Sequence, residues 1–262
     1  MSGPSAGGGP RGAAFFDLDK TLMQGSSAFQ FARAAHQAGL MTRRRLLADA
    51  AANVRYRLRG ASDAQSEALR DRIAASLQGV RVRDLERLRV PIVARILPRL
   101  YPRMLQVAYD HQDAGRPAYI VTAAAQELAD SLANVMAFDG AIGSHLSEVS
   151  DGVYTGRSTG SFLYRDAKAD AIRELAAARG YDLAECYAYS DSVSDLPMLE
   201  VVGHPIVVNP DAELTRLARQ NGWQIVRLDR LRLGLTALGA TALTAVAGGV
   251  TAALLVGRRS SD

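Results

Sequence analysis

Five short apolar runs restrict the fold of this chain more than any other feature of its sequence. Each run is rich in β-branched or aromatic residues and ends in polar or turn-forming residues, as strands do. The apolar residues are continuous rather than alternating, which is typical of parallel strands that are covered on both faces. The runs occupy residues 13–18, 118–122, 186–190, 205–208 and 224–228.

Helical patterns separate most of these runs. They occupy residues 126–136, 166–179, 195–201 and 211–220. Strand alternating with helix predicts an α/β fold with a Rossmann-like parallel sheet, whose ligand site lies outside the carboxyl ends of the strands. Residues 141–160, which contain an Asp151-Gly152 turn signal, predict a small hairpin.

Residues 22–112 interrupt this alternation. Apolar residues such as Leu47, Ala51, Val54 and Leu58 recur there at helical spacing. About 90 residues are far more than an ordinary crossover between two strands needs. We therefore expect an inserted α-helical cap, on a core domain formed by residues 13–21 and 113–230. The Gly-, Pro- and Ser-rich residues 1–12 are expected to form a disordered leader without a secretory signal.

The C-terminal residues 233–257 contain no charged residue and have arginines on both sides. As a helix they extend about 37 Å, enough to cross a hydrocarbon core of about 30 Å. Ala, Gly and Thr outnumber Leu and Val in this segment, which weakens its preference for a membrane. Two interpretations stay open: a single-pass membrane helix that tethers a cytoplasmic catalytic domain, or an apolar helix that packs on a partner.

The basic residues are unusual because only Lys20 and Lys168 are lysines. Codon usage in a GC-rich genome explains most of the arginine excess, but a lysine in such a chain also marks a position suited to a compact ammonium. Residues 22–112 contain 16 arginines and 7 acidic residues. This basic segment is either a solvated helix face or a surface for anionic lipid headgroups. It has few aromatic residues for base stacking, so we expect no nucleic-acid partner.

The strongest motif is Asp17-Leu18-Asp19, which follows the first apolar run directly. Two residues that are two positions apart on an extended chain point in the same direction. Their carboxylates repel each other unless a cation or a shared proton lies between them. A calcium-binding loop is excluded, because Leu22 and Ala28 stand where such a loop needs Gly and Glu.

Further polar residues follow other strands of the predicted sheet. Thr122 ends the second run, Lys168 lies at the start of a helix, and Asp191 and Asp195 follow the third run. Each has an ordinary structural explanation: a strand end, a solvated charge or a helix N-cap. Together, however, they occupy strand ends that one parallel sheet would gather at the same edge.

This set of motifs resembles the haloacid dehalogenase superfamily of phosphotransferases, in the branch similar to phosphoserine phosphatase. The resemblance covers residues 13–228. Its motifs are Asp17-x-Asp19-x-Thr21, Thr122, Lys168 and Asp191-x-x-x-Asp195. It implies a Mg²⁺-dependent phosphomonoester hydrolase that works through an aspartyl-phosphate intermediate.

The resemblance also implies a role for each residue. Asp17 would be the nucleophile and Asp19 the general acid and base. Asp17, the backbone carbonyl of Asp19 and Asp191 would hold Mg²⁺. Thr122 and Lys168 would bind the phosphoryl oxygens, and Asp195 would orient Lys168 or the waters of the metal.

The motifs define the substrate less closely than they define the reaction. Phosphoserine phosphatases carry an acidic residue nine positions after the nucleophile, where it meets the amino group of serine, and this chain has Ser26 there. We therefore expect a different small or lipid phosphomonoester. The alternative is a non-catalytic regulatory or scaffolding protein at the membrane. The four histidines are scattered and suggest no metal site.

Overall fold

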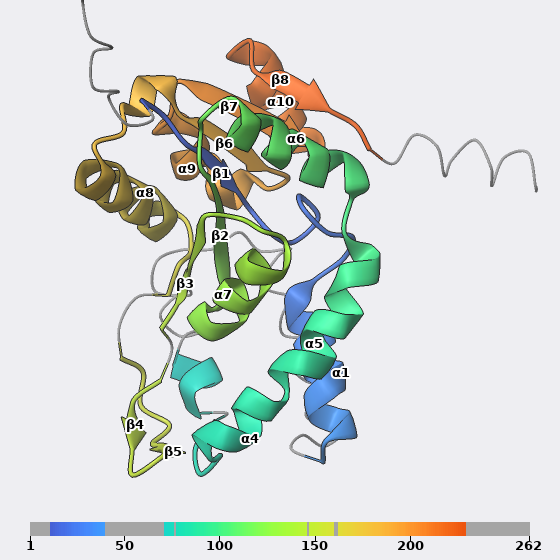
Figure 1. Ribbon diagram of the computed structural model, residues 1–262, viewed down its shortest axis with the longest axis vertical. Coiled ribbons are helices and arrows are strands. Elements are labelled where there is room, and N and C mark those ends of the chain that lie inside the picture. Colours follow the sequence, from blue (N-terminus) through green and yellow to red (C-terminus); the bar gives the residue numbers. More distant parts are fainter. Residues whose placement is uncertain (1–10, 40–70, 76, 146, 160–161, 229–262) are drawn as a thin grey trace, which may run out of the picture. The chain divides into compact units, whose positions relative to one another are not determined.

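The computed structural model describes residues 11–39, 71–75, 77–145, 147–159 and 162–228. Its centre is a six-stranded sheet with the order β3-β2-β1-β6-β7-β8, in which every neighbouring pair is parallel (Figure 1). The strands are β1 (Ala14–Phe16), β2 (Ala118–Ala125), β3 (Gly140–Ser144), β6 (Tyr187–Ser190), β7 (His204–Val208) and β8 (Gln224–Val226). The expected Rossmann-like parallel sheet is confirmed, and each of the five apolar runs contributes a strand.

The sequence pattern was wrong about β3, which we expected within a hairpin. This strand pairs parallel with β2 in the main sheet, and its Gly143 packs closely against the start of α7. A Cβ atom on Gly143 would lie 2.7 Å from the Cα of Gln126. The hairpin that we expected over residues 141–160 is shorter. It consists of β4 (Val149–Ser150) and β5 (Val153–Tyr154), which pair antiparallel around Asp151 and Gly152.

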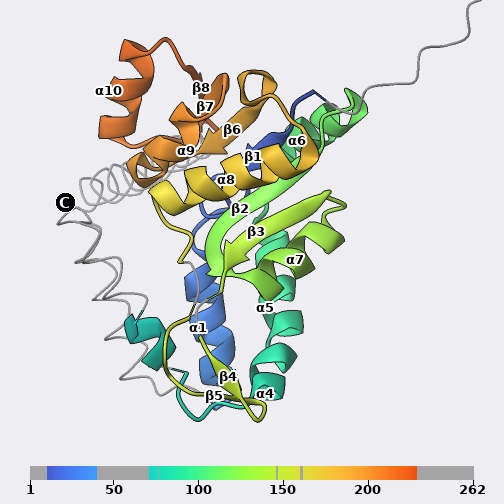
Figure 2. The same ribbon diagram turned by 90° about the vertical axis from the view of Figure 1, so that its left-hand side faces the viewer.

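Helices cover both faces of the sheet (Figure 2). They are α6 (Pro102–Asp113), α7 (Gln126–Val135), α8 (Asp166–Arg179), α9 (Leu196–Glu200) and α10 (Ala212–Gln220). Because successive strand residues point to opposite faces, Phe15 packs in a core cluster with residues of α8, α9 and α10. Phe16 packs on the other face, against His111 of α6 and against Phe138.

The described part of the insertion is helical, as expected. It contains α1 (Ser27–Gln37), α4 (Val82–Arg87), α5 (Arg89–Ile96) and the short 3₁₀ helix η1 (Leu97–Arg99), and α1 packs against α5. Residues 40–70, and with them the Leu47–Leu58 pattern, lie outside the described residues.

Helix α6 lies within residues 22–112, yet it belongs with the sheet. Its residues Met104, Ala108 and His111 are buried, and it packs on β2. The boundary that we expected at residue 112 would place α6 in the cap. Its packing places the helix in the core domain instead.

The chain forms two compact units, residues 1–226 and 227–262. Of the second unit the structure describes only Arg227 and Leu228, so the candidate membrane segment 233–257 lies outside the described residues, as does most of the leader. Within the described part, no helix combines the length and the apolar character that crossing a membrane requires.

Candidate active site

Three central strands bring the predicted residues to one edge of the sheet. Phe16 of β1 is in register with Ile120 of β2 and with Tyr189 of β6, so the residues that follow each of them emerge side by side. The N–H of Asp17 donates a hydrogen bond to the carbonyl of Tyr189 at 2.9 Å. Asp17 is buried although it carries a carboxylate, with 7% of its surface exposed.

Lys168 joins two of these carboxylates. Its Nζ donates to Asp17 Oδ1 at 2.7 Å and to Asp195 Oδ2 at 2.8 Å. Asp195 Oδ2 also accepts a hydrogen bond from the Ser190 hydroxyl at 2.7 Å. The first turn of α8 positions the lysine, whose side chain is 4% exposed. A buried ammonium is therefore fixed beside Asp17.

The charges of this cluster perturb one another strongly. Burial raises the pKa of Asp17 to about 8; the carboxylates of Asp195, Asp191 and Asp19 add to the rise, and Lys168 opposes it. Burial alone would lower the pKa of Lys168, but Asp17 and Asp195 outweigh this effect and raise it above its ordinary value. The lysine therefore stays protonated, and the cluster favours an additional positive charge.

Asp191 has a different partner. The Nζ of Lys20 donates to Asp191 Oδ2 at 3.2 Å. Burial raises the pKa of Asp191 to about 6, against the opposing effect of Lys20. Lys20 has a left-handed backbone with φ of 60°, in the turn that follows β1.

Asp19 is held by the start of the insertion. Its Oδ2 accepts from the Ser26 hydroxyl at 3.1 Å and its Oδ1 from the N–H of Ser27 at 2.7 Å. These residues begin α1, and a helix N-terminus favours a negative charge. Asp19 thus has hydrogen-bond donors of its own, separate from those of Lys168.

Thr122 was expected to end its strand, but it lies within β2, which continues to Ala125; its surface is 3% exposed. The strand register places it beside the carboxyl end of β1, and its hydroxyl accepts a hydrogen bond from the N–H of Ala124 at 3.2 Å. Five of the six predicted residues therefore follow β1 or β6 or lie on α8, and Thr122 lies within β2 beside the carboxyl end of β1.

Four contacting residues were not among the predicted site residues: Lys20, Ser26, Ser27 and Ser190. The rarity of lysine marked Lys20 as unusual but gave it no partner. Ser190 immediately precedes a predicted acidic residue. The contacts of the two serines at the start of α1 depend on a turn that no sequence pattern specifies.

The net charge of the cluster indicates whether a metal ion fits there. With every group ionised it contains four carboxylates and two ammonium groups, an excess of two negative charges, and the raised pKa values of Asp17 and Asp191 favour protons that reduce this excess. The ionised groups are those of Asp17, Asp19, Asp191, Asp195, Lys20 and Lys168. A divalent cation would neutralise this excess. Within the described residues, no group of three or more His, Cys, Asp or Glu side chains forms a complete ligand set. A cation here would therefore take one or two carboxylates together with carbonyl and water oxygens, as Mg²⁺ commonly does.

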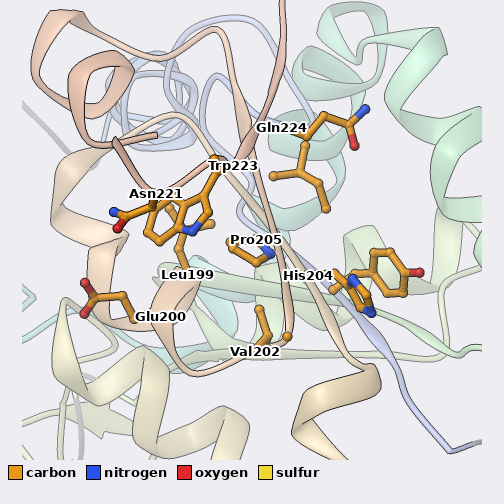
Figure 3. A pocket seen from close by; sticks show the side chains of 12 residues that line it. Leu199, Glu200, Val202, His204, Pro205, Asn221, Trp223 and Gln224 are labelled. Carbon is orange, nitrogen blue, oxygen red and sulfur yellow. The ribbon is translucent and has the colours of Figure 1, made fainter. Parts of the chain in front are cut away.

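A separate pocket of about 550 Å³ lies at the opposite ends of the strands (Figure 3). It is lined by Tyr187, His204 and Gln224, which begin β6, β7 and β8, and by Trp223 nearby. The six predicted residues lie at the other edge of the sheet, beside or beyond the carboxyl end of β1. None of them lines this pocket, which is therefore distinct from the charged cluster.

Comparisons with known proteins identify the family of the chain. The model of the haloacid dehalogenase-like hydrolase family matches residues 14–200. The chain is 38% identical over 222 residues to the "Inhibition of morphological differentiation protein" of Streptomyces azureus, covering 84% of this chain and 80% of that protein. It is also 38% identical over 252 residues to "Phosphoserine phosphatase SerB1" of Mycobacterium tuberculosis, covering 95% and 81%.

Two solved structures share the fold. A protein of unknown function from Bordetella pertussis superposes with a TM-score of 0.73 at 28% identity, over 83% of this chain and 99% of that one. A phosphoserine phosphatase in its apo form superposes with a TM-score of 0.60 at 20% identity, over 87% and 98%. The second likeness concerns the fold alone.

Proposed function

The chain belongs to the haloacid dehalogenase-like hydrolase family, and we propose that it hydrolyses phosphomonoesters through a covalent aspartyl-phosphate on Asp17. One observation carries this proposal: a buried carboxylate lies 2.7 Å from a buried ammonium, while a second carboxylate is held separately by the insertion. The first pair suits attack on a phosphoryl group, and the separate carboxylate suits proton transfer.

In the first step, an oxygen of Asp17 forms a bond to phosphorus while the ester P–O bond breaks. Asp19 gives a proton to the departing oxygen. Water then attacks phosphorus as Asp19 takes up its proton, and the bond between Asp17 and phosphorus breaks to release phosphate. The hydrogen bonds from Ser26 and Ser27 hold Asp19 for both transfers.

Lys168 and Thr122 would hold the oxygens of the transferred phosphoryl group, where charge spreads in the transition state. The position of Lys168 depends on Asp195, which Ser190 holds in turn. We assign Asp195 and Ser190 the role of orienting this lysine.

We propose Mg²⁺ as the cofactor, held by Asp17, Asp191 and the backbone carbonyl of Asp19. When bound, it would supply positive charge that keeps Asp17 ionised and balances the phosphoryl oxygens. With Asp17 and Asp191 ionised, as ligands of a metal ion must be, the cluster carries two excess negative charges, which supports a divalent rather than a monovalent ion. Asp19 keeps its side chain for protons, because only its carbonyl would touch the ion.

For the substrate, we propose a phosphomonoester other than L-phosphoserine. Ser26 stands where an acid would be needed for the amino group of serine, and its hydroxyl is engaged with Asp19. A lipid phosphate gains little support from Arg81 and Arg87, because both contact Asp84 at the surface. The membrane tether at residues 233–257 stays a prediction.

The test is Mg²⁺-dependent release of phosphate from p-nitrophenyl phosphate. Asp17→Asn should lower the rate by at least about a thousand-fold, because the nucleophile is lost. The matched control is Asp170→Asn, which changes an exposed carboxylate on α8 and should leave the rate unchanged. Retained activity in Asp17→Asn would contradict the covalent mechanism.

A panel of soluble and lipid phosphomonoesters, including L-phosphoserine, then identifies the substrate class. We expect a higher kcat/KM for at least one other compound than for L-phosphoserine. If the folded protein releases no phosphate from any compound, the regulatory alternative replaces the enzymatic one.

A further inference from the structure

Lys20 occupies a backbone position that does not suit a lysine. Its φ of 60° is left-handed, a conformation that costs free energy for every residue except glycine. The turn that imposes it is closed by hydrogen bonds from the N–H groups of Leu22 and Met23 to the carbonyl of Leu18, at 3.1 and 3.0 Å. Glycine would fit this turn without strain. The turn therefore does not explain a lysine at this position, and its side-chain contact is the next feature to consider.

The Lys20 side chain contacts Asp191, and the two side chains differ in their exposure to solvent. The Asp191 side chain is 10% exposed, whereas the Lys20 side chain is 48% exposed. The carboxylate is held in the site, but the ammonium lies on a flexible stem that reaches solvent. Lys20 can separate from Asp191 at little cost in free energy, because water then solvates its ammonium group.

The chain's other lysine behaves in the opposite way. Lys168 is 4% exposed and contacts two carboxylates, so its ammonium is a permanent part of the cluster. Lys20 contacts the remaining buried carboxylate through one oxygen only. One lysine is thus fixed and the other exchangeable.

We propose that Lys20 competes with the divalent cation for Asp191 and so sets the cation concentration at which the site fills. The inference rests on the proposed function, in which Asp191 is a ligand of the cation. An ammonium and a divalent cation on one carboxylate repel each other, and Lys20, unlike Lys168, has no second carboxylate contact that offsets this repulsion. Binding of the cation therefore requires Lys20 to move toward solvent.

The experiment measures Mg²⁺ affinity of the full chain by isothermal titration calorimetry, without substrate. Lys20→Met removes the competing charge and should bind Mg²⁺ about ten-fold more tightly than wild type. Lys20→Gly should do the same and also suits the left-handed turn, so folding is preserved. Lys20→Arg keeps the charge and should stay near wild type.

Two further variants make the result decisive. Arg173→Met removes an equal charge from the exposed surface of α8, where Arg173 contacts Asp170, and should leave the affinity unchanged. Asp191→Asn should weaken binding in every background. Equal or weaker Mg²⁺ binding by Lys20→Met and Lys20→Gly would overturn the competition, provided that Asp191→Asn still weakens binding. If Asp191→Asn has no effect, the cation site of the proposed function is itself wrong.

Discussion

Replacing Lys168 by methionine tests whether the buried ion cluster stabilises the fold as its geometry suggests. The substitution keeps most of the side-chain volume and removes the charge between Asp17 and Asp195. Breaking a buried pair by removing one partner costs about 3–5 kcal/mol. Asp17 has a raised pKa of about 8 and takes up a proton readily, which limits the loss. We therefore expect the free energy of unfolding to fall by about 3 kcal/mol.

The same helix provides a matched control. Arg173 contacts Asp170 at 2.7 Å, the same distance as that between Lys168 and Asp17, but its side chain is 54% exposed. Arg173→Met should cost at most about 1 kcal/mol, because exposed pairs contribute little. Urea unfolding at pH 7, followed by circular dichroism, measures both values. Equal losses in the two variants would refute the argument that burial gives the Lys168 contacts their strength.

Two other substitutions have definite outcomes. Lys168→Arg keeps the charge but overfills a buried site. The free energy of unfolding should therefore fall by about 1–3 kcal/mol, and the rate of phosphate release should drop. Near-normal values of both would show that codon usage alone explains this lysine. Burial, assisted by Arg116, lowers the pKa of His111 to about 4 from 6.5. Because the unfolded chain then binds the proton first, the contribution of His111 to stability should fall by about 3 kcal/mol as the pH drops from 7 to 4. The raised pKa values of Asp17 and Asp191 act in the opposite direction, so the test is the difference between variants. In urea titrations, His111→Gln should lose less stability than wild type between pH 7 and pH 4, whereas His145→Gln, which alters an exposed histidine, should follow wild type; a wild-type pH profile in His111→Gln would contradict the lowered pKa.

The sheet could be predicted because parallel strands buried on both faces need continuous apolar residues. The same reasoning failed for β3, because its sequence Gly-Ala-Ile-Gly-Ser is not a continuous apolar run, and at Gly143 the backbone of Gln126 leaves no room for a side chain. It also placed α6 with the insertion. Helical spacing shows that a helix forms, but it does not show which surface the helix covers.

The site could be predicted as far as its residues follow strand ends. Asp17 and Asp191 follow β1 and β6, so the order of the sheet brings them together. The contact between Lys20 and Asp191 depends on a left-handed turn, and that between Ser26 and Asp19 on how α1 begins. Both are set by local backbone geometry, which residue patterns leave undetermined.

The central claim is that Asp17 becomes phosphorylated, and trapping the intermediate tests it most directly. Asp19→Asn slows hydrolysis of the intermediate, whereas p-nitrophenyl phosphate has a leaving group that needs little protonation. After incubation of this variant with p-nitrophenyl phosphate and Mg²⁺, borohydride reduction converts an aspartyl-phosphate to homoserine, which mass spectrometry locates. We expect homoserine at position 17. Its absence there, from a protein whose wild type releases phosphate, or its appearance at another aspartate would contradict the account.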